Sequence, residues 1–412
     1  MGNSAGKEND INNLMHVTIV KDADLPKDQV AQNNATVWKI INERYWELEM
    51  NKFKGFDEFN FFRAINPAFH LEKEEKKPGI VVGDQDTFQM YKELYDFCYT
   101  DAYTEEKKEE EEGEKNADQI EDEEEPAPPV PESRLFNFNA NHLPNVEDVT
   151  AIKRLYLKAE RNIIGLPLLP GIISEEQLLE IRDVLVTACK SFEGMLEIKE
   201  SNTFKLDEVK PKKLKDLTDR GIVGKPEDPY SKSAGVARWW PQGRVVANGV
   251  DNKFQIVMNQ YEHLKVEWTV HHGSSVNAFH TFFKSLNNFH KHLKRKQLGG
   301  FWKDPKYGYI SVDPTKFGTM FTCELDFIVH AIPMYFSKEE FVEECADVLG
   351  IIVIPLESDE RNMFTMRVRD PQWMDEVEQL GLLLNSINRL AQSDRSLYFS
   401  PRNAGDTLFK FE

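Results

Sequence analysis

The segment GYISVDPTKFGT, residues 308–319, is the most informative stretch of this chain. Its first half belongs to a predicted strand at residues 307–312. Five more strand candidates lie on either side of it, at 253–258, 264–270, 320–331, 351–356 and 362–369. No βαβ rhythm with glycine-rich turns appears, which disfavours a doubly wound parallel sheet. The predicted fold class is therefore α+β, with a large antiparallel sheet flanked by helices.

Three long helices are predicted around these strands. The first begins after Ser174, which forms a capping-box pattern with Gln177. The second carries phenylalanines and leucines at helical spacing between residues 279 and 293 and ends before Gly299, since glycine is a common helix stop. The third covers about residues 374–390.

The chain divides into four predicted parts. Residues 1–30 predict a flexible tail, and residues 31–103 a small α-helical domain with helices near 36–50 and 86–98. Residues 104–134 predict an acidic linker that ends in a proline-rich run, and residues 135–412 a large α/β domain. The tail partly matches an N-myristoylation signal at Gly2. Because Gly6 stands where that signal has Ser or Thr, a tail without a lipid is favoured.

The composition is that of a globular protein, with 40% hydrophobic and 11% aromatic residues in 412. Four widely spaced cysteines form no CxxC pair and indicate reduced thiols in the cytoplasm. No apolar run approaches the ~18 residues of a membrane span, and no secretory signal is present. We therefore expect a cytoplasmic protein without a membrane span.

The net charge of −19 is unevenly distributed, because residues 105–125 contain 13 acidic residues and 3 lysines. This balance argues against nucleic-acid binding through phosphate contacts. The acidic run is best interpreted as a solvated, disordered loop. A docking tail for a basic partner surface is the alternative.

Segment 308–319 resembles the phosphagen kinases, the creatine and arginine kinases and other ATP:guanidino phosphotransferases, which read G-Y-[IL]-x-[TS]-C-P-[ST]-N-[LI]-G-T there. Residues 225–229 and 235–241 resemble the family's K-P-x-x-P and G-x-A-R-D-W-P, with Trp239 in place of aspartate. Residues 259–266 resemble N-E-E-D-H-L-R-[VI], and residues 79–84 resemble G-I-V-A-G-D. The resemblance covers about residues 30–100 and 135–412. These motifs are specific only as a set.

The resemblance implies where the family's chemistry would fall. The reactive cysteine corresponds to Asp313, and the carboxylate pair that handles the guanidine corresponds to Gln260 and Tyr261. The family's phosphate-binding arginines correspond to the following residues: Tyr156, Lys158, Arg161, Lys265 and Thr322. A further arginine, in a loop near residues 350–360, has no counterpart that aligns.

The substituted residues differ chemically from those of the family. A lysine attracts phosphate as a point charge but lacks the planar fork of arginine, so Lys158, Arg161 and Lys265 are expected as a reduced phosphate-binding remnant. Tyr156 and Thr322 mark lost cations. An amide does not titrate and a phenol has a pKa of about 10, so neither Gln260 nor Tyr261 predicts a base.

Other candidate groups have simpler interpretations. Asp313 has the chemistry of a base, but a carboxylate beside phosphate oxygens adds repulsion, so a neutral substitution is favoured. Trp239 and Trp240 are expected to pack in the core or at an interface. The histidines at 271, 272, 280, 290 and 292 lack metal-ligand spacing, and no metal site is expected.

The sequence favours a catalytically inactive phosphagen-kinase-like protein that acts as a structural or interaction component. Active members of the family are often placed beside ATP-consuming motors, including those of cilia, so we expect protein partners in a larger, cytoskeletal or axonemal assembly. The first alternative is a sensor that binds a nucleotide or a guanidino compound. The second is a divergent active kinase. ATP with Mg would be expected as a ligand only under these alternatives.

Overall fold

The computed structural model describes residues 61–69, 79–92, 94–96, 98–99, 143–146, 151–172, 174–250, 252–271, 274–357, 362–369, 371–399 and 408. The expected lipidation at Gly2, the helix near 36–50 and the linker at 104–134 lie outside these residues. Among the described residues, none of the helices combines the length and the hydropathy of a membrane-spanning segment. All four cysteines are buried.

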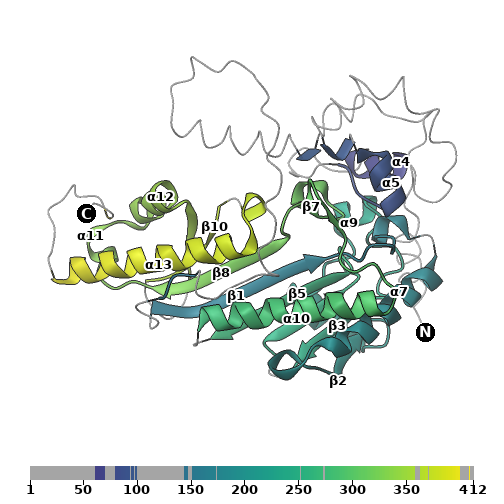
Figure 1. The fold of residues 1–412 in the computed structure, drawn as a ribbon, viewed down its shortest axis with the longest axis horizontal. Helices are drawn as coiled ribbons and strands as arrows, with labels where there is room; N and C mark the ends of the chain where they lie inside the picture. The colour runs from purple at the N-terminus through teal and green to yellow at the C-terminus, as the bar shows by residue number, and fades with distance from the viewer. Residues whose placement is uncertain are drawn as a thin grey trace, which may run out of the picture.

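An eight-stranded sheet forms the centre of the molecule (Figure 1), in the order β2-β3-β4-β5-β1-β8-β10-β9. Every neighbouring pair is antiparallel, which confirms the predicted fold class. The strands are β1 (Ile152–Arg161), β2 (Ile198–Lys205), β3 (Val245–Gly249), β4 (Phe254–Met258), β5 (Leu264–His271), β8 (Phe321–Ile328), β9 (Ile351–Pro355) and β10 (Met363–Val368). A separate small hairpin joins β6 (Lys303–Asp304) to β7 (Gly308–Tyr309). The strand expected at 307–312 is therefore limited to two residues.

The three predicted long helices are present as α7 (Glu175–Ala188), α10 (Ser275–Arg295) and α13 (Glu376–Phe399). The Ser174 side chain caps α7 by accepting a hydrogen bond from the Gln177 amide, as the sequence pattern predicts. The other α-helices of the large domain are α8 (Pro211–Asp219), α9 (Pro229–Ser233), α11 (Ile332–Tyr335) and α12 (Lys338–Leu349). Its short 3-10 turns are η7 (Leu169–Gly171), η8 (Cys189–Ser191), η9 (Gly194–Leu196), η10 (Pro314–Lys316) and η11 (Pro371–Trp373).

Around β1, the sheet has one helix-covered face and one polar face. Helix α10 packs on β1 and β5, and α13 packs on β8 and β10, so both helices cover the same face (Figure 1). Strand β1 shows the consequence, because Leu157 and Ala159 are fully buried while Tyr156, Lys158 and Glu160 alternate with them and are only partly buried. Side chains alternate along a strand, so these three polar residues lie on the face away from α10 and α13.

The described amino-terminal part contains α4 (Phe61–Ile65), η3 (Asn66–Phe69) and α5 (Gln85–Met90) and packs on the large domain. The Val82 amide donates to the Val312 carbonyl at 2.9 Å, and the Leu168 amide donates to the Gly83 carbonyl at 2.7 Å. A Cβ at Gly171 would lie 2.3 Å from the same Gly83 oxygen, so this close approach of two backbones requires glycine. Segment 308–319 thus lies against residues 79–84, which connects two of the motifs found in the sequence.

Candidate functional site

Four of the positions predicted from the family's arginines lie side by side on the polar face of the sheet. Lys158 pairs across the strands with Thr322 of β8 on one side and with Glu267 of β5 on the other. Lys265 pairs with Glu160, the next outward-facing residue of β1. The structure therefore brings Tyr156, Lys158, Lys265 and Thr322 to one surface, as the resemblance implies.

Two carboxylates that the sequence analysis did not single out lie among these side chains. Lys158 Nζ is 3.3 Å from Glu160 Oε2, and Lys265 Nζ is 3.2 Å from Glu267 Oε1. The Tyr156 hydroxyl donates a 2.7 Å hydrogen bond to the same Glu267 oxygen. Each lysine of this face is therefore already paired with an anion of the protein.

The charge of Glu160 is stabilised by three lysines at once. Burial alone would raise the pKa of this carboxyl, but Lys158, Lys316 and Lys265 outweigh burial and hold its pKa below the usual value. Burial would lower the pKa of Lys316, but the carboxyls of Asp313, Glu160 and Glu262 outweigh it and raise that pKa. Lys316 thus joins the remnant as a third cation, and Glu160 remains ionised among the three ammonium groups.

The same face continues with more ion pairs toward the far end of β1. The Arg154 guanidinium binds Asp326 through two hydrogen bonds, of 2.6 and 3.0 Å, and lies 3.7 Å from Glu324. The Thr365 hydroxyl donates to Asp326 at 2.6 Å. These pairs add carboxylates, so the surface offers few cations to an incoming anion.

Arg161 does not belong to this face, which corrects the expectation that it joins Lys158 and Lys265 in one phosphate-binding group. It is an odd number of residues from Lys158, and its guanidinium lies on the helix-covered side, where only 1% of the residue is exposed. It donates to the carbonyls of Glu160 at 2.7 Å and Thr319 at 2.9 Å, and its guanidinium carbon lies 3.7 Å from the centre of the Tyr309 ring. Arg161 is a buried structural cation.

The two residues at the family's carboxylate positions have structural contacts. The Tyr261 hydroxyl is 2.6 Å from Ser231 Oγ and 3.3 Å from an oxygen of Asp228, the residue that caps α9. Burial raises the pKa of Tyr261, so the phenol is neutral near pH 7. Within the described part of the chain, the Gln260 Oε1 atom is buried and accepts no hydrogen bond.

Asp313, at the position of the family's cysteine, caps the turn that follows it. Its carboxylate accepts from the Thr315 amide at 3.1 Å and from the Thr315 hydroxyl at 2.7 Å, at the start of η10. The residue is 4% exposed. A carboxylate with these partners fixes the loop geometry, in the manner usual for aspartate at a cap.

A buried polar network holds motifs 259–266 and 308–319 against the end of β1. Glu262 accepts hydrogen bonds from Asn162, from the Ser311 hydroxyl at 2.5 Å and from the Val312 amide at 3.1 Å. Burial and the charge of Glu160 raise the pKa of Glu262 to about 7. His263 Nδ1 accepts from the Ile163 amide at 3.1 Å, so its proton is on Nε2, which donates to the Pro167 carbonyl at 2.9 Å.

The two tryptophan candidates have packing positions. Trp239 packs against the main hydrophobic core. Trp240 packs against a second hydrophobic cluster that includes Val246 of β3 and Val257 of β4. Burial lowers the pKa of His263 to about 4, so its ring is neutral. Among the described residues, no group of three His, Cys, Asp or Glu side chains is arranged to hold a metal ion.

Comparison with known proteins gives consistent matches. A sequence model of the family described as ATP:guanido phosphotransferase, C-terminal catalytic domain, matches residues 181–346. Arginine kinase of Stichopus japonicus is 23% identical over 337 residues, which cover 81% of this chain and 81% of that protein. Lombricine kinase of Eisenia fetida is 23% identical over 302 residues, which cover 73% of this chain and 72% of the relative.

Solved structures show the same fold. A crystal structure of lombricine kinase superposes with a TM-score of 0.66 at 17% identity, covering 86% of this chain and 89% of that one. The duplicated taurocyamine kinase of Schistosoma mansoni, with bound transition state analog components, gives a TM-score of 0.67 at 14% identity. That match covers 94% of this chain and 51% of the duplicated one.

Proposed function

This chain belongs to the phosphagen kinase family, and we propose that within it the chain transfers no phosphoryl group and serves as a structural component of a larger protein assembly. One observation supports the absence of phosphoryl transfer. The carboxylate of Glu160 lies among Lys158, Lys265 and Lys316, so the protein supplies its own anion where a triphosphate would need free cations.

Phosphoryl transfer depends on cations that hold the nucleotide phosphates and on a group that orients the acceptor. On this face both remnant lysines are paired with carboxylates, and Glu324 and Asp326 add further negative charge. A triphosphate at this surface would have to displace these ion pairs and approach the carboxylates closely. The residues present therefore do not fit ATP with Mg.

The groups at the acceptor positions also fail to fit. Tyr261 is a neutral phenol that is hydrogen-bonded to Ser231, and the Asp313 carboxylate caps η10. Loss of a single preorganised donor costs other enzymes on the order of 3 kcal/mol of transition-state stabilisation. Several such groups are replaced together here, so most of the rate enhancement is expected to be lost even without additivity.

An interaction role is supported by exposed apolar side chains at one end of the described chain. Met334 is 73% exposed and Phe399 is 75% exposed, with Tyr335 and Tyr398 beside them in sequence. Helix α11, which carries Met334, packs against α13, which carries Phe399. Exposed apolar groups of this kind are typical of protein contacts. The acidic run at 105–125 is a second candidate docking element, for a basic partner surface.

A coupled assay with MgATP and creatine, arginine, lombricine, taurocyamine or glycocyamine tests the catalytic half. We expect no turnover above background. A rate near ~1 s⁻¹, the low end for kinases, would refute the proposal. Equilibrium binding of ATP without turnover would instead support the sensor interpretation.

Recovery of tagged variants with a cytoskeletal or axonemal fraction tests the assembly half. Lys158→Ala with Lys265→Ala should leave recovery unchanged, because the remnant face is not the contact surface. Deletion of residues 104–134, or Met334→Ser with Phe399→Ser, should reduce recovery at least tenfold if these elements make the contact. Loss of recovery for the double lysine variant alone, with its fold intact by circular dichroism, would favour the sensor.

A further inference from the structure

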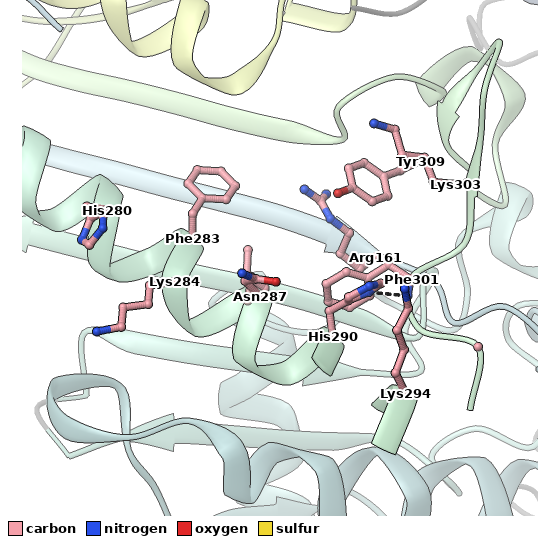
Figure 2. Close-up of a pocket in the computed structure, with 12 residues that line it drawn as sticks. Arg161, His280, Phe283, Lys284, Asn287, His290, Lys294, Phe301, Lys303 and Tyr309 are labelled. Carbon is pink, nitrogen blue, oxygen red and sulfur yellow. Dashed lines mark hydrogen bonds between the residues drawn. The ribbon is translucent and has the colours of Figure 1, made fainter. Parts of the chain in front are cut away.

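A cavity of about 660 Å³ lies on the opposite face of the sheet from the lysine remnant. Its walls come from α10, the end of β1 and the segment 299–309, which includes the hairpin β6–β7 (Figure 2). Lining residues from α10 recur at helical spacing, as with His280, Lys284, Asn287 and Lys294, so one side of this helix faces the space. The volume lies within the usual range for small-molecule sites.

The cavity is lined by cations without matching anions. Lys284 and Lys294 from α10 and Lys303 from β6 are all exposed at its rim. Within the described residues, no carboxylate lines the cavity and none forms an ion pair with these three lysines. Arg161 also lines it, but its charge is met by Glu376 at 3.5 Å. In a chain of net charge −19, three lysines without acidic partners create a local positive potential that attracts an anion.

Aromatic rings supply the rest of the wall. Phe283 comes from α10, while Phe301 and Tyr309 come from the segment 299–309 (Figure 2). The Lys303 ammonium is 5.4 Å from the centre of the Tyr309 ring, so charge and ring face lie together. Such a wall favours a ligand with a flat apolar body.

Two polar side chains of the cavity wall, Asn287 and His290, can contribute to ligand binding. The Asn287 Oδ1 atom is buried and accepts no hydrogen bond from the described residues, so it is available to a donor. His290 Nδ1 accepts a 3.0 Å hydrogen bond from the Phe301 amide. Burial and the charges of Lys294 and Lys291 lower the pKa of His290, so the ring is neutral and carries its proton on Nε2.

We propose that this cavity binds a small organic anion with an aromatic body, its sulfonate, carboxylate or phosphate group meeting Lys284, Lys294 and Lys303. The ring system lies against Phe283, Phe301 and Tyr309, and Asn287 accepts a hydrogen bond from the ligand. The site is separate from the lysine remnant, because the sheet stands between them. Binding here does not depend on whether the remnant face holds a nucleotide.

The test uses 1-anilinonaphthalene-8-sulfonate, followed by fluorescence, with uncharged N-phenyl-1-naphthylamine as the matched neutral probe. Lys284→Gln with Lys294→Gln should weaken binding of the sulfonate at least tenfold and leave binding of the neutral probe within twofold. Lys212→Gln with Lys215→Gln, which removes two exposed lysines of α8, should change neither affinity. Each variant is first shown to keep its fold by circular dichroism.

A second, nearly isosteric variant locates the binding inside the cavity. Asn287→Asp introduces a carboxylate next to the proposed ligand and should also weaken the sulfonate at least tenfold, with the neutral probe unaffected. Equal sulfonate affinity in the protein and both cavity variants would overturn the proposal. So would a parallel loss of the neutral probe, because the contact would then be apolar alone.

Discussion

The cations on the two faces of β1 differ in burial and in their bonding partners. Arg161, on the helix-covered face, is fully buried, donates to three carbonyls and stacks on Tyr309. Lys158, on the polar face, is partly exposed and has an acidic neighbour of its own strand for a partner. Both correspond to arginines of one family motif. The contrast shows that positions three residues apart on one strand have different roles here, Arg161 in holding the fold together and Lys158 in a surface ion pair.

The buried network supports the same distinction. Asn162, Glu262, His263 and Ser311 are bonded to one another or to the backbone, and they join motifs that are distant in the sequence. Their substitution would leave buried polar groups without partners, which costs about 1–3 kcal/mol for each group. The lysines of the polar face carry less of this penalty, because the side chains of Lys158 and Lys265 are partly exposed to water. These lysines can therefore change while the fold persists.

Removing the cation on each face in turn is the most direct test of the contrast between the faces. Arg161→Met should lower the free energy of unfolding by about 3–5 kcal/mol, because it leaves Glu376 buried without its nearest cation. Lys158→Met, on the other face of the same strand, should cost less than about 1 kcal/mol. Urea unfolding of both variants measures the difference. Similar losses in the two variants would show that the faces are not distinct.

The pH dependence of the free energy of unfolding tests the buried network. His263 stays neutral in the folded protein until its pKa of about 4, whereas an unfolded histidine takes up a proton near pH 6.5. The free energy of unfolding should therefore fall as the pH is lowered through this window, by about 2 kcal/mol between pH 7 and pH 5 from this residue.

His263→Gln keeps a polar side chain that does not titrate and is the matched control. Glu262 acts in the opposite direction, because its pKa is raised to about 7 and its protonated form favours the folded state below that pH. This effect is present in both proteins, so their difference isolates the histidine. An unchanged pH dependence in His263→Gln would show that the ring is not buried in its neutral form.

The smallest effect is expected at Tyr261. Tyr261→Phe removes a hydrogen bond to Ser231 and should cost about 0.5–1.5 kcal/mol of stability. It should leave the background rate in the coupled assay unchanged, because a neutral phenol contributes no base. Turnover by the protein that disappears in this variant would give Tyr261 a catalytic role and would weaken the contrast between the two faces.

Much of the fold could be predicted from the sequence because its signals are local. The Ser174 cap, the apolar spacing of α10 and the alternation in β10 each depend on neighbouring residues. Strand β2 was not predicted because most of its residues are at least partly exposed and show no clear alternation. Strand β3 is a five-residue run that ends in glycine, too short for a periodic signal.

The positions of the candidate site could be predicted from the sequence, but the ion pairs at these positions were not predicted. The family resemblance singled out Lys158 and Lys265, which the structure places on β1 and β5, yet the cross-strand neighbours of these lysines depend on strand register, which no short motif contains. The position of Glu160 was accessible, because it lies two residues from Lys158 on the same side of a strand. The same alternation, applied to Arg161, separates it from Lys158. The ion pairs within β1 and β5, Lys158 with Glu160 and Lys265 with Glu267, decide which cations remain available.

We propose that carboxylates of the protein neutralise the lysines that a nucleotide would need for its phosphates. Calorimetric titration with MgATP, on the protein and on Glu160→Gln with Glu267→Gln, tests it most directly. We expect no binding by the protein at ~1 mM nucleotide and an affinity at least about tenfold higher in the double variant. Glu197→Gln with Glu200→Gln, two exposed carboxylates near the start of β2, is the matched control and should gain nothing. Equal affinity in the protein and the Glu160/Glu267 variant, or binding by the protein itself at this concentration, would contradict the claim.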